Sequence, residues 1–119
     1  MVEISQEFIV PDDMEVLEAI GEWPEVDDEG VHRIVCHGED GDSLFVSYSP
    51  IEKSVRVRWD KSNGDQLLDL FREGATRLTV ASDRQEAHLA AEYHVGDSVG
   101  ILNIQTAPRF AVRDHLLLT

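Results

Sequence analysis

The sequence predicts an α+β domain of two layers, in which two short helices cover a mainly antiparallel sheet of about six strands in the order (β)αβββαβββ. Three observations predict this class. Two segments place apolar residues on one face with the 3.6-residue period of a helix. Other segments are rich in β-branched and aromatic residues or alternate apolar with polar residues, as strands do. The turns between these strands are short, and short turns join antiparallel neighbours.

The first helix is predicted from about residue 12 to residue 20. Asp12 or Asp13 can cap its N-terminus, and Gly21 suits the position just after its end. Its apolar stripe consists of Val16, Leu17 and Ile20. Because a helix this short is marginal on its own, we expect it to pack on a larger element.

Three strands are predicted next, at 31–37, 43–49 and 54–59, with a hairpin turn at Asp40-Gly41. The second helix is predicted from about 65 to 73, because Asp65 can cap it and Gly74 can end it. Its buried face would consist of Leu67, Leu68, Leu70 and Phe71.

The last strands are predicted at 76–81, 86–95 and 99–106, with short edge pieces at 110–112 and 116–118. The segment 86–95 is ambiguous, since many of its residues also form helices well. Strict alternation favours a strand, and the residues that would share its apolar face are Ala87, Leu89, Ala91, Tyr93 and Val95.

Composition indicates one acidic domain spanning residues 1–119, with 24 Asp and Glu against 10 Lys and Arg and a net charge of −14. Nucleic acid and anionic membrane are therefore excluded as partners, because both need a basic surface. A negative field of this size steers cationic proteins toward the chain. However, two lysines against eight arginines, with many acids, are also typical of a salt-adapted or high-GC proteome.

The chain holds one cysteine, Cys36, so it cannot form an internal disulfide. Its N-terminal segment has no basic region, and its apolar runs are too short to span a bilayer. These features predict a cytoplasmic protein.

No catalytic, metal or cofactor site is predicted. Phosphate-loop, dinucleotide, nucleophile-elbow and zinc-protease motifs are absent, and the acid-rich turns 39–42 and 60–65 do not fit a calcium loop. Cys36 and His37 are adjacent on a strand and would point to opposite faces, so the cysteine is interpreted as a buried apolar residue. A polar stripe of potential ligands is too extended to hold one ion, with about 20 Å between its histidines, and comprises Glu86, His88, Glu92 and His94.

The densest acidic segment lies between the first helix and the first long strand, and we call residues 22–29 the acidic loop. Trp23 within it is either a plug of the core, which is the favoured interpretation, or an exposed aromatic anchor. Arg56 and Arg58 share the polar face of one strand, where we expect them to pair with acids of neighbouring strands.

These observations together predict a non-catalytic protein-binding module, of the immunity or inhibitor type, that docks on a basic partner. The predicted contact residues are Glu22, Trp23, Glu25, Asp27, Asp28 and Glu29. Two alternatives stay open. One is a small metal- or ligand-dependent enzyme with a pocket between sheet and helices, near His88 and His94. The other is a structural subunit or homo-oligomer that assembles through the strand edge at 110–118.

Overall fold

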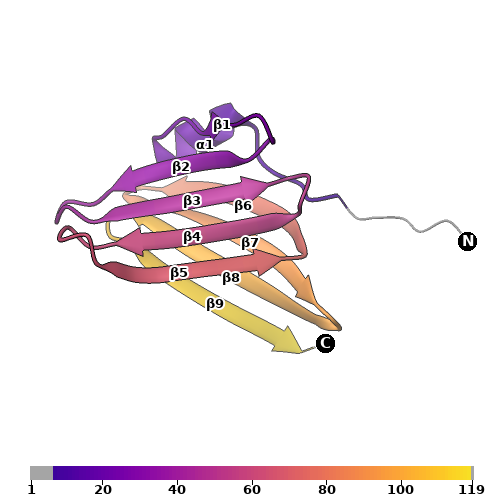
Figure 1. Ribbon diagram of the computed structural model, residues 1–119. Coiled ribbons are helices and arrows are strands. Elements are labelled where there is room, and N and C mark those ends of the chain that lie inside the picture. Colours follow the sequence, from indigo (N-terminus) through magenta and orange to yellow (C-terminus); the bar gives the residue numbers. More distant parts are fainter. Residues whose placement is uncertain (1–6, 119) are drawn as a thin grey trace, which may run out of the picture.

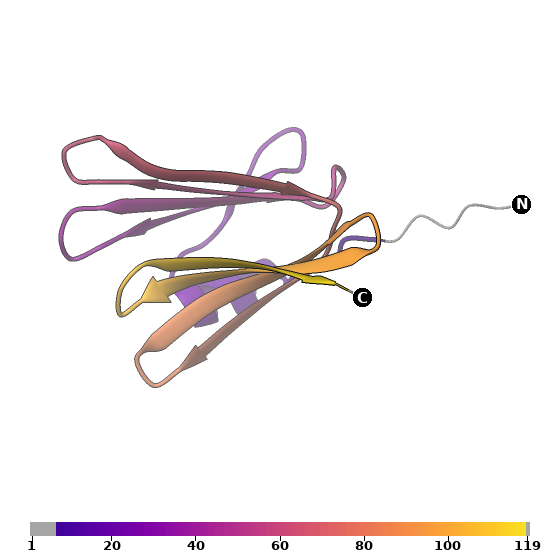
Figure 2. The ribbon, with the colours of Figure 1, turned by 90° about the horizontal axis from the view of Figure 1, so that it is seen from below.

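The computed structural model describes residues 7–118 and consists of two stacked antiparallel sheets with one helix (Figures 1 and 2). The residues outside this range, 1–6 and 119, include the N-terminal segment in which no basic region was found. The helix α1 is Asp13–Ile20. The first sheet contains β1 (Glu25–Val26), β2 (His32–His37), β3 (Ser43–Ser49), β4 (Ser54–Asp60) and β5 (Gln66–Glu73). The second sheet contains β6 (Ala75–Asp83), β7 (Glu86–Val95), β8 (Ser98–Ala107) and β9 (Ala111–Leu118).

The first predicted helix is confirmed as α1, with the predicted caps. The Asp12 carboxylate accepts a hydrogen bond from the Glu15 backbone N–H at 2.8 Å, and the Glu15 side chain accepts one from the Asp12 N–H at 3.2 Å. Gly21 adopts a left-handed conformation with φ of 86° and closes the helix end. Val16 is fully buried, and the helix packs against β6 and β7.

The second predicted helix is wrong, because residues 66–73 form strand β5 and pair with β4, with one register shift between Trp59 and Asp60. Leu68 and Leu70 point into the protein, while Leu67 and Phe71 lie on the outer face and are about half exposed, at 55% and 48%. Apolar side chains on both faces removed the alternation that marks a strand and left a pattern that also fits a helix. The Gly74 expected to end a helix has φ of 75° and instead turns β5 directly into β6.

The predicted layers are also corrected, since a second sheet rather than a pair of helices covers the inner face of the first. Within residues 7–118 there are nine strands instead of about six, although the antiparallel pairing is as predicted. The ambiguous segment 86–95 is strand β7, and the two edge pieces belong to the continuous strand β9. In both sheets the strands lie side by side in the order of the chain.

The two sheets are stacked on each other (Figure 2), and the core between them is lined by alternate residues of the long strands. Among its fully buried side chains are Ile34, Leu44, Val46, Tyr48, Val57, Leu89, Leu102 and Ile104. The helix α1 is too short to cross a membrane, and none longer occurs in the described range.

A polar contact joins the sheets at the side where β5 and β9 run. The Tyr93 hydroxyl donates a hydrogen bond to the Asp114 carboxylate at 2.7 Å, and Arg72 of β5 donates to the same carboxylate through its Nε at 3.0 Å. Directly opposite Tyr93 on β8 stands Gly100, whose missing side chain leaves the space that the tyrosine ring occupies.

Candidate protein-binding site

The acidic loop begins just after α1 and contains the short strand β1, which pairs with β2 at the edge of the first sheet. The Asp27 carboxylate organises the loop, because it accepts hydrogen bonds from the backbone N–H groups of Glu29 at 2.8 Å and Val31 at 3.0 Å. It also pairs with Arg33 at 2.8 Å. These bonds, above all the one from Val31, hold the pKa of Asp27 below its usual value. Asp27 therefore shapes the loop from within.

The other acids predicted to contact a partner are exposed to solvent; they are Glu22, Glu25, Asp28 and Glu29. Trp23 is also exposed, by 53%, so its interpretation as a core plug is wrong. Pro24 is buried in its place. An exposed indole between carboxylates is the alternative that the sequence left open.

Two further apolar side chains are exposed near the acidic loop. Val26 on β1 is 50% exposed. Ile51, from the turn between β3 and β4, is 77% exposed and lies beside the loop end, within 3.4 Å of the position that a side chain on Gly30 would take. The acidic loop is therefore a mixed surface, in which apolar groups large enough to anchor a partner stand among negative charges.

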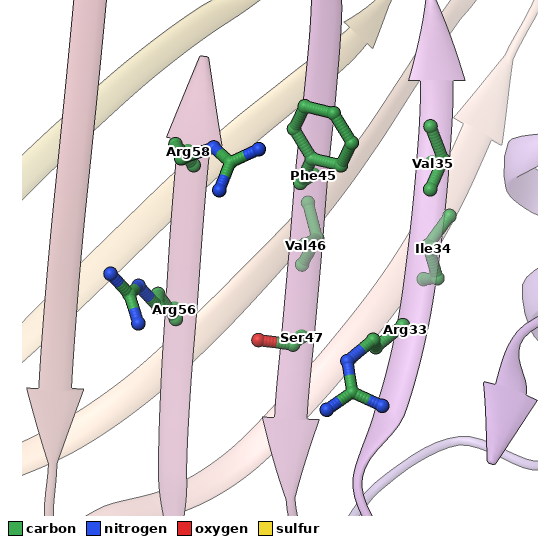
Figure 3. A pocket seen from close by; sticks show the side chains of 8 residues that line it. All are labelled: Arg33, Ile34, Val35, Phe45, Val46, Ser47, Arg56 and Arg58. Carbon is green, nitrogen blue, oxygen red and sulfur yellow. The ribbon is translucent and has the colours of Figure 1, made fainter. Parts of the chain in front are cut away.

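The outer face of the first sheet borders the acidic loop, because Glu25 of β1 lies directly opposite Arg33 of β2. We call this outer face the arginine face. Two rows of directly opposed residues cross it, as Figure 3 shows for β2 to β4. Completed by β5, one row is Arg33, Ser47, Arg56 and Phe71, and the other is Val35, Phe45, Arg58 and Asp69.

The arginines of this face are held by acids and by an aromatic ring. The predicted pairing with an acid of a neighbouring strand is confirmed for Arg56, whereas Arg58 pairs with an acid of its own strand. Arg56 donates two hydrogen bonds to the Asp69 carboxylate, through Nε at 2.9 Å and Nη2 at 2.6 Å. Arg58 pairs with Asp60 at 3.2 Å and lies over the Phe45 ring, 4.4 Å from its centroid.

Arg33 was not singled out from the sequence, although the alternation of buried Ile34 and Cys36 with Arg33 and Val35 places it on the outer face. Between the rows lies a hollow of about 330 Å³. Its lining includes all three arginines together with Val35, Phe45 and Ser47.

The residues considered for catalysis lie elsewhere. Cys36 is buried, as expected, and burial together with the charge of Glu22 raises the pKa of its thiol to about 11. His88 and His94 lie on the outer face of the second sheet and not in a pocket between sheet and helices. In the described part of the chain no three His, Cys, Asp or Glu side chains are arranged to hold a metal ion.

A larger open cavity, of about 710 Å³, lies at the end of the sandwich where the β2–β3 and β8–β9 turns meet. Trp59 and Phe110 form part of its wall, with their rings edge to face at 5.7 Å. The carboxylate of Asp42 accepts a hydrogen bond from the Trp59 indole at 3.0 Å and another from the Ser62 backbone at 3.1 Å. The Asp42 carboxylate thus connects the β2–β3 turn to β4 and to the β4–β5 turn, and both of its oxygens already accept hydrogen bonds from the protein.

No protein-family model matches the chain, and no curated protein sequence matches it. Its fold is similar to that of a chain in the contact-dependent growth inhibition toxin–immunity protein complex from Klebsiella pneumoniae 342. The TM-score is 0.80, the similarity covers 92% of this chain and 96% of that chain, and the sequences are 15% identical. Similarity at this level of identity shows a shared fold.

Proposed function

We propose that this chain is an immunity-type protein, a non-catalytic binding module that neutralises a toxin by docking on it. The observation that carries the proposal is the fold, which matches a chain of a toxin–immunity protein complex over nearly the whole length of both chains. The net charge of −14 favours the immunity role over the toxin role, because a binding protein with a strong field captures a cationic partner rapidly.

The contact begins at the acidic loop. Its exposed carboxylates, Glu22, Glu25, Asp28 and Glu29, attract a basic surface of the partner during the encounter. Trp23 then packs against that surface as an aromatic anchor, since its indole is already half exposed and little rearrangement is needed. The bound chain then inhibits the partner by steric occlusion, because it covers the cleft in which the partner binds its own substrate.

The test pairs this chain with the polypeptide encoded beside its gene. We expect the two to form a stable complex, and co-expression to restore growth that the neighbouring polypeptide alone inhibits. The dissociation constant should rise at least tenfold between about 0.05 and 0.3 M salt, because contacts between exposed charges are screened over this range.

Two variants locate the contact. Trp23→Ala should weaken binding by about 2 kcal/mol, the scale of an aromatic hot spot. Val95→Ala, a matched control, removes a side chain of similar exposure, 54%, at the end of β7 and should leave binding unchanged. The proposal fails if the pair forms no complex, or if the complex is equally tight at both salt concentrations.

A further inference from the structure

We propose that the arginine face is a second half of the docking surface, and that it receives a carboxylate side chain of the partner over Ser47, between Arg33 and Arg56. The inference rests on the proposed function, since it concerns the same protein partner. The two contacts differ in the charge of the partner's group: the acidic loop attracts basic groups, whereas the arginine face of this acidic chain binds an acidic group.

Three of the eight arginines of the chain gather on this face, and each is already paired with an acid, Asp27, Asp69 or Asp60. Acids outnumber bases by 24 to 10 in the sequence. Across the eight positions of the two rows, however, there are three arginines and one acid. The rest are a serine and three apolar residues, of which Phe71 is 48% and Val35 36% exposed. Arginine and aromatic side chains with few lysines and acids are the composition of protein interfaces.

The geometry of the row suits a carboxylate. Arg33 and Arg56 both lie directly opposite Ser47, so their backbones are about 10 Å apart, two strand spacings. Because the serine between them is small, the hollow opens there, as Figure 3 shows. Arg33 and the Ser47 hydroxyl can donate hydrogen bonds to the two oxygens of one carboxylate, and Arg56, whose guanidinium is turned toward Asp69 on β5, adds positive charge beside them (Figure 3).

The existing ion pairs leave donors for this contact. Asp69 takes Nε and Nη2 of Arg56, and Asp27 takes Nη1 of Arg33. A guanidinium has five N–H groups, so each arginine can donate to a second carboxylate without giving up the first. Both side chains are 54% exposed, and the internal pairs hold them in extended positions before a partner arrives.

The position of the face next to the acidic loop gives it a further role. Glu25 and Arg33 are direct neighbours across β1 and β2, so an exposed acid and an exposed arginine stand one strand spacing apart. A partner must then present a basic group to the loop and an acidic group to the row at a fixed separation. Opposed like charges penalise any other orientation, so the arginine face fixes the register of docking.

The experiment titrates the full chain with two blocked peptides, tetraglutamate and tetralysine, and follows the arginine Nε–H and tryptophan indole signals by ¹H–¹⁵N NMR. We expect tetraglutamate to shift the Nε–H signals of Arg33 and Arg56 saturably, with a dissociation constant on the order of 1 mM. The net charge of −14 opposes any general attraction of this peptide, so binding must come from the row itself. Arg33→Gln and Arg56→Gln should each weaken binding about fivefold. Arg113→Gln, on the exposed outer face of β9, is the matched control and should leave binding unchanged.

The two peptides separate this inference from the proposed function. Tetralysine should shift the Trp23 indole signal and leave the signals of Arg33 and Arg56 in place, and its failure would weaken the proposed loop contact only. The inference on the arginine face is overturned if tetraglutamate shifts no arginine signal. It is equally overturned if the Arg113 signal shifts as much as those of Arg33 and Arg56, or if the two glutamine variants bind as tightly as the parent chain.

Discussion

Replacing Gly100 by alanine should break the contact between the two sheets. A Cβ atom built at Gly100 falls 2.1 Å from Cζ of the Tyr93 ring and 2.5 Å from both Cε atoms, far inside the 3.4 Å of ordinary van der Waals contact. The ring must therefore move by more than about 1 Å. Since Tyr93 is 3% exposed in a packed core, no empty space receives it.

Two losses contribute to the cost. Forcing a side chain into a packed core costs about 1–3 kcal/mol. The displaced ring also loses the 2.7 Å hydrogen bond from its hydroxyl to Asp114, whose partly exposed position limits this loss to about 1 kcal/mol. We expect Gly100→Ala to lower the free energy of unfolding by about 3 kcal/mol, and the melting temperature of a chain of 119 residues by roughly 12 °C.

The assay is urea unfolding followed by tryptophan fluorescence and circular dichroism. In a Tyr93→Leu background the added methyl has room, so Gly100→Ala should then cost less than about 1 kcal/mol. Gly100 is not among the glycines with a positive φ, so the cost of the substitution comes from the contact with the Tyr93 ring and not from backbone strain. The reasoning is refuted if Gly100→Ala costs the same in both backgrounds.

Four other outcomes are expected. Among residues 7–118 the buried Tyr48 hydroxyl finds no hydrogen-bond partner, and its pKa is raised, mainly by burial. Tyr48→Phe should therefore raise the free energy of unfolding by about 1 kcal/mol at neutral pH. The parent chain should also lose stability as pH rises above about 10, where only the unfolded tyrosine ionises readily, and a urea series showing no smaller loss in Tyr48→Phe would contradict this. Cys36, with a thiol pKa of about 11 instead of 9.0, should react with a disulfide reagent at pH 8 at least about a hundredfold more slowly in the folded than in the urea-unfolded chain. Asp12→Ala should cost about 1 kcal/mol in thermal unfolding through loss of the helix cap, and an unchanged melting temperature would show that the cap is dispensable.

The parts of the fold that could be predicted are those whose signal is local. Asp12 and Gly21 bound α1 through contacts within a few residues, and the alternation of Leu89, Ala91 and Tyr93 was enough to identify β7. Strand β5 was missed because its identity depends on pairing with β4 and on an outer face that carries Leu67 and Phe71. The position of the second sheet was missed for the same reason, since two helices had been expected to fill the layer that this sheet occupies.

The candidate site was predictable in its charge but not in its shape. The acids of the acidic loop are visible in the sequence, whereas the exposure of Trp23 depends on how the chain leaves α1 and on the burial of Pro24 beside it. Arg33 and Arg56 are 23 positions apart in the chain, and only the pairing of neighbouring strands brings them to either side of Ser47. The sequence of a single strand does not predict which residues of other strands will lie beside it in such a row.

The order of the strands has a consequence for how the chain acquires its structure. Each strand from β2 to β5, and again from β7 to β9, pairs with the strand made just before it, so every ladder needs only a short loop to close. Closing short loops costs little entropy, and chains with such neighbouring contacts fold faster than sandwiches whose strands cross between sheets. During synthesis the first sheet, complete at residue 73, can form while the second is still being made. The acidic loop and the arginine face both lie in the part of the chain that is made first.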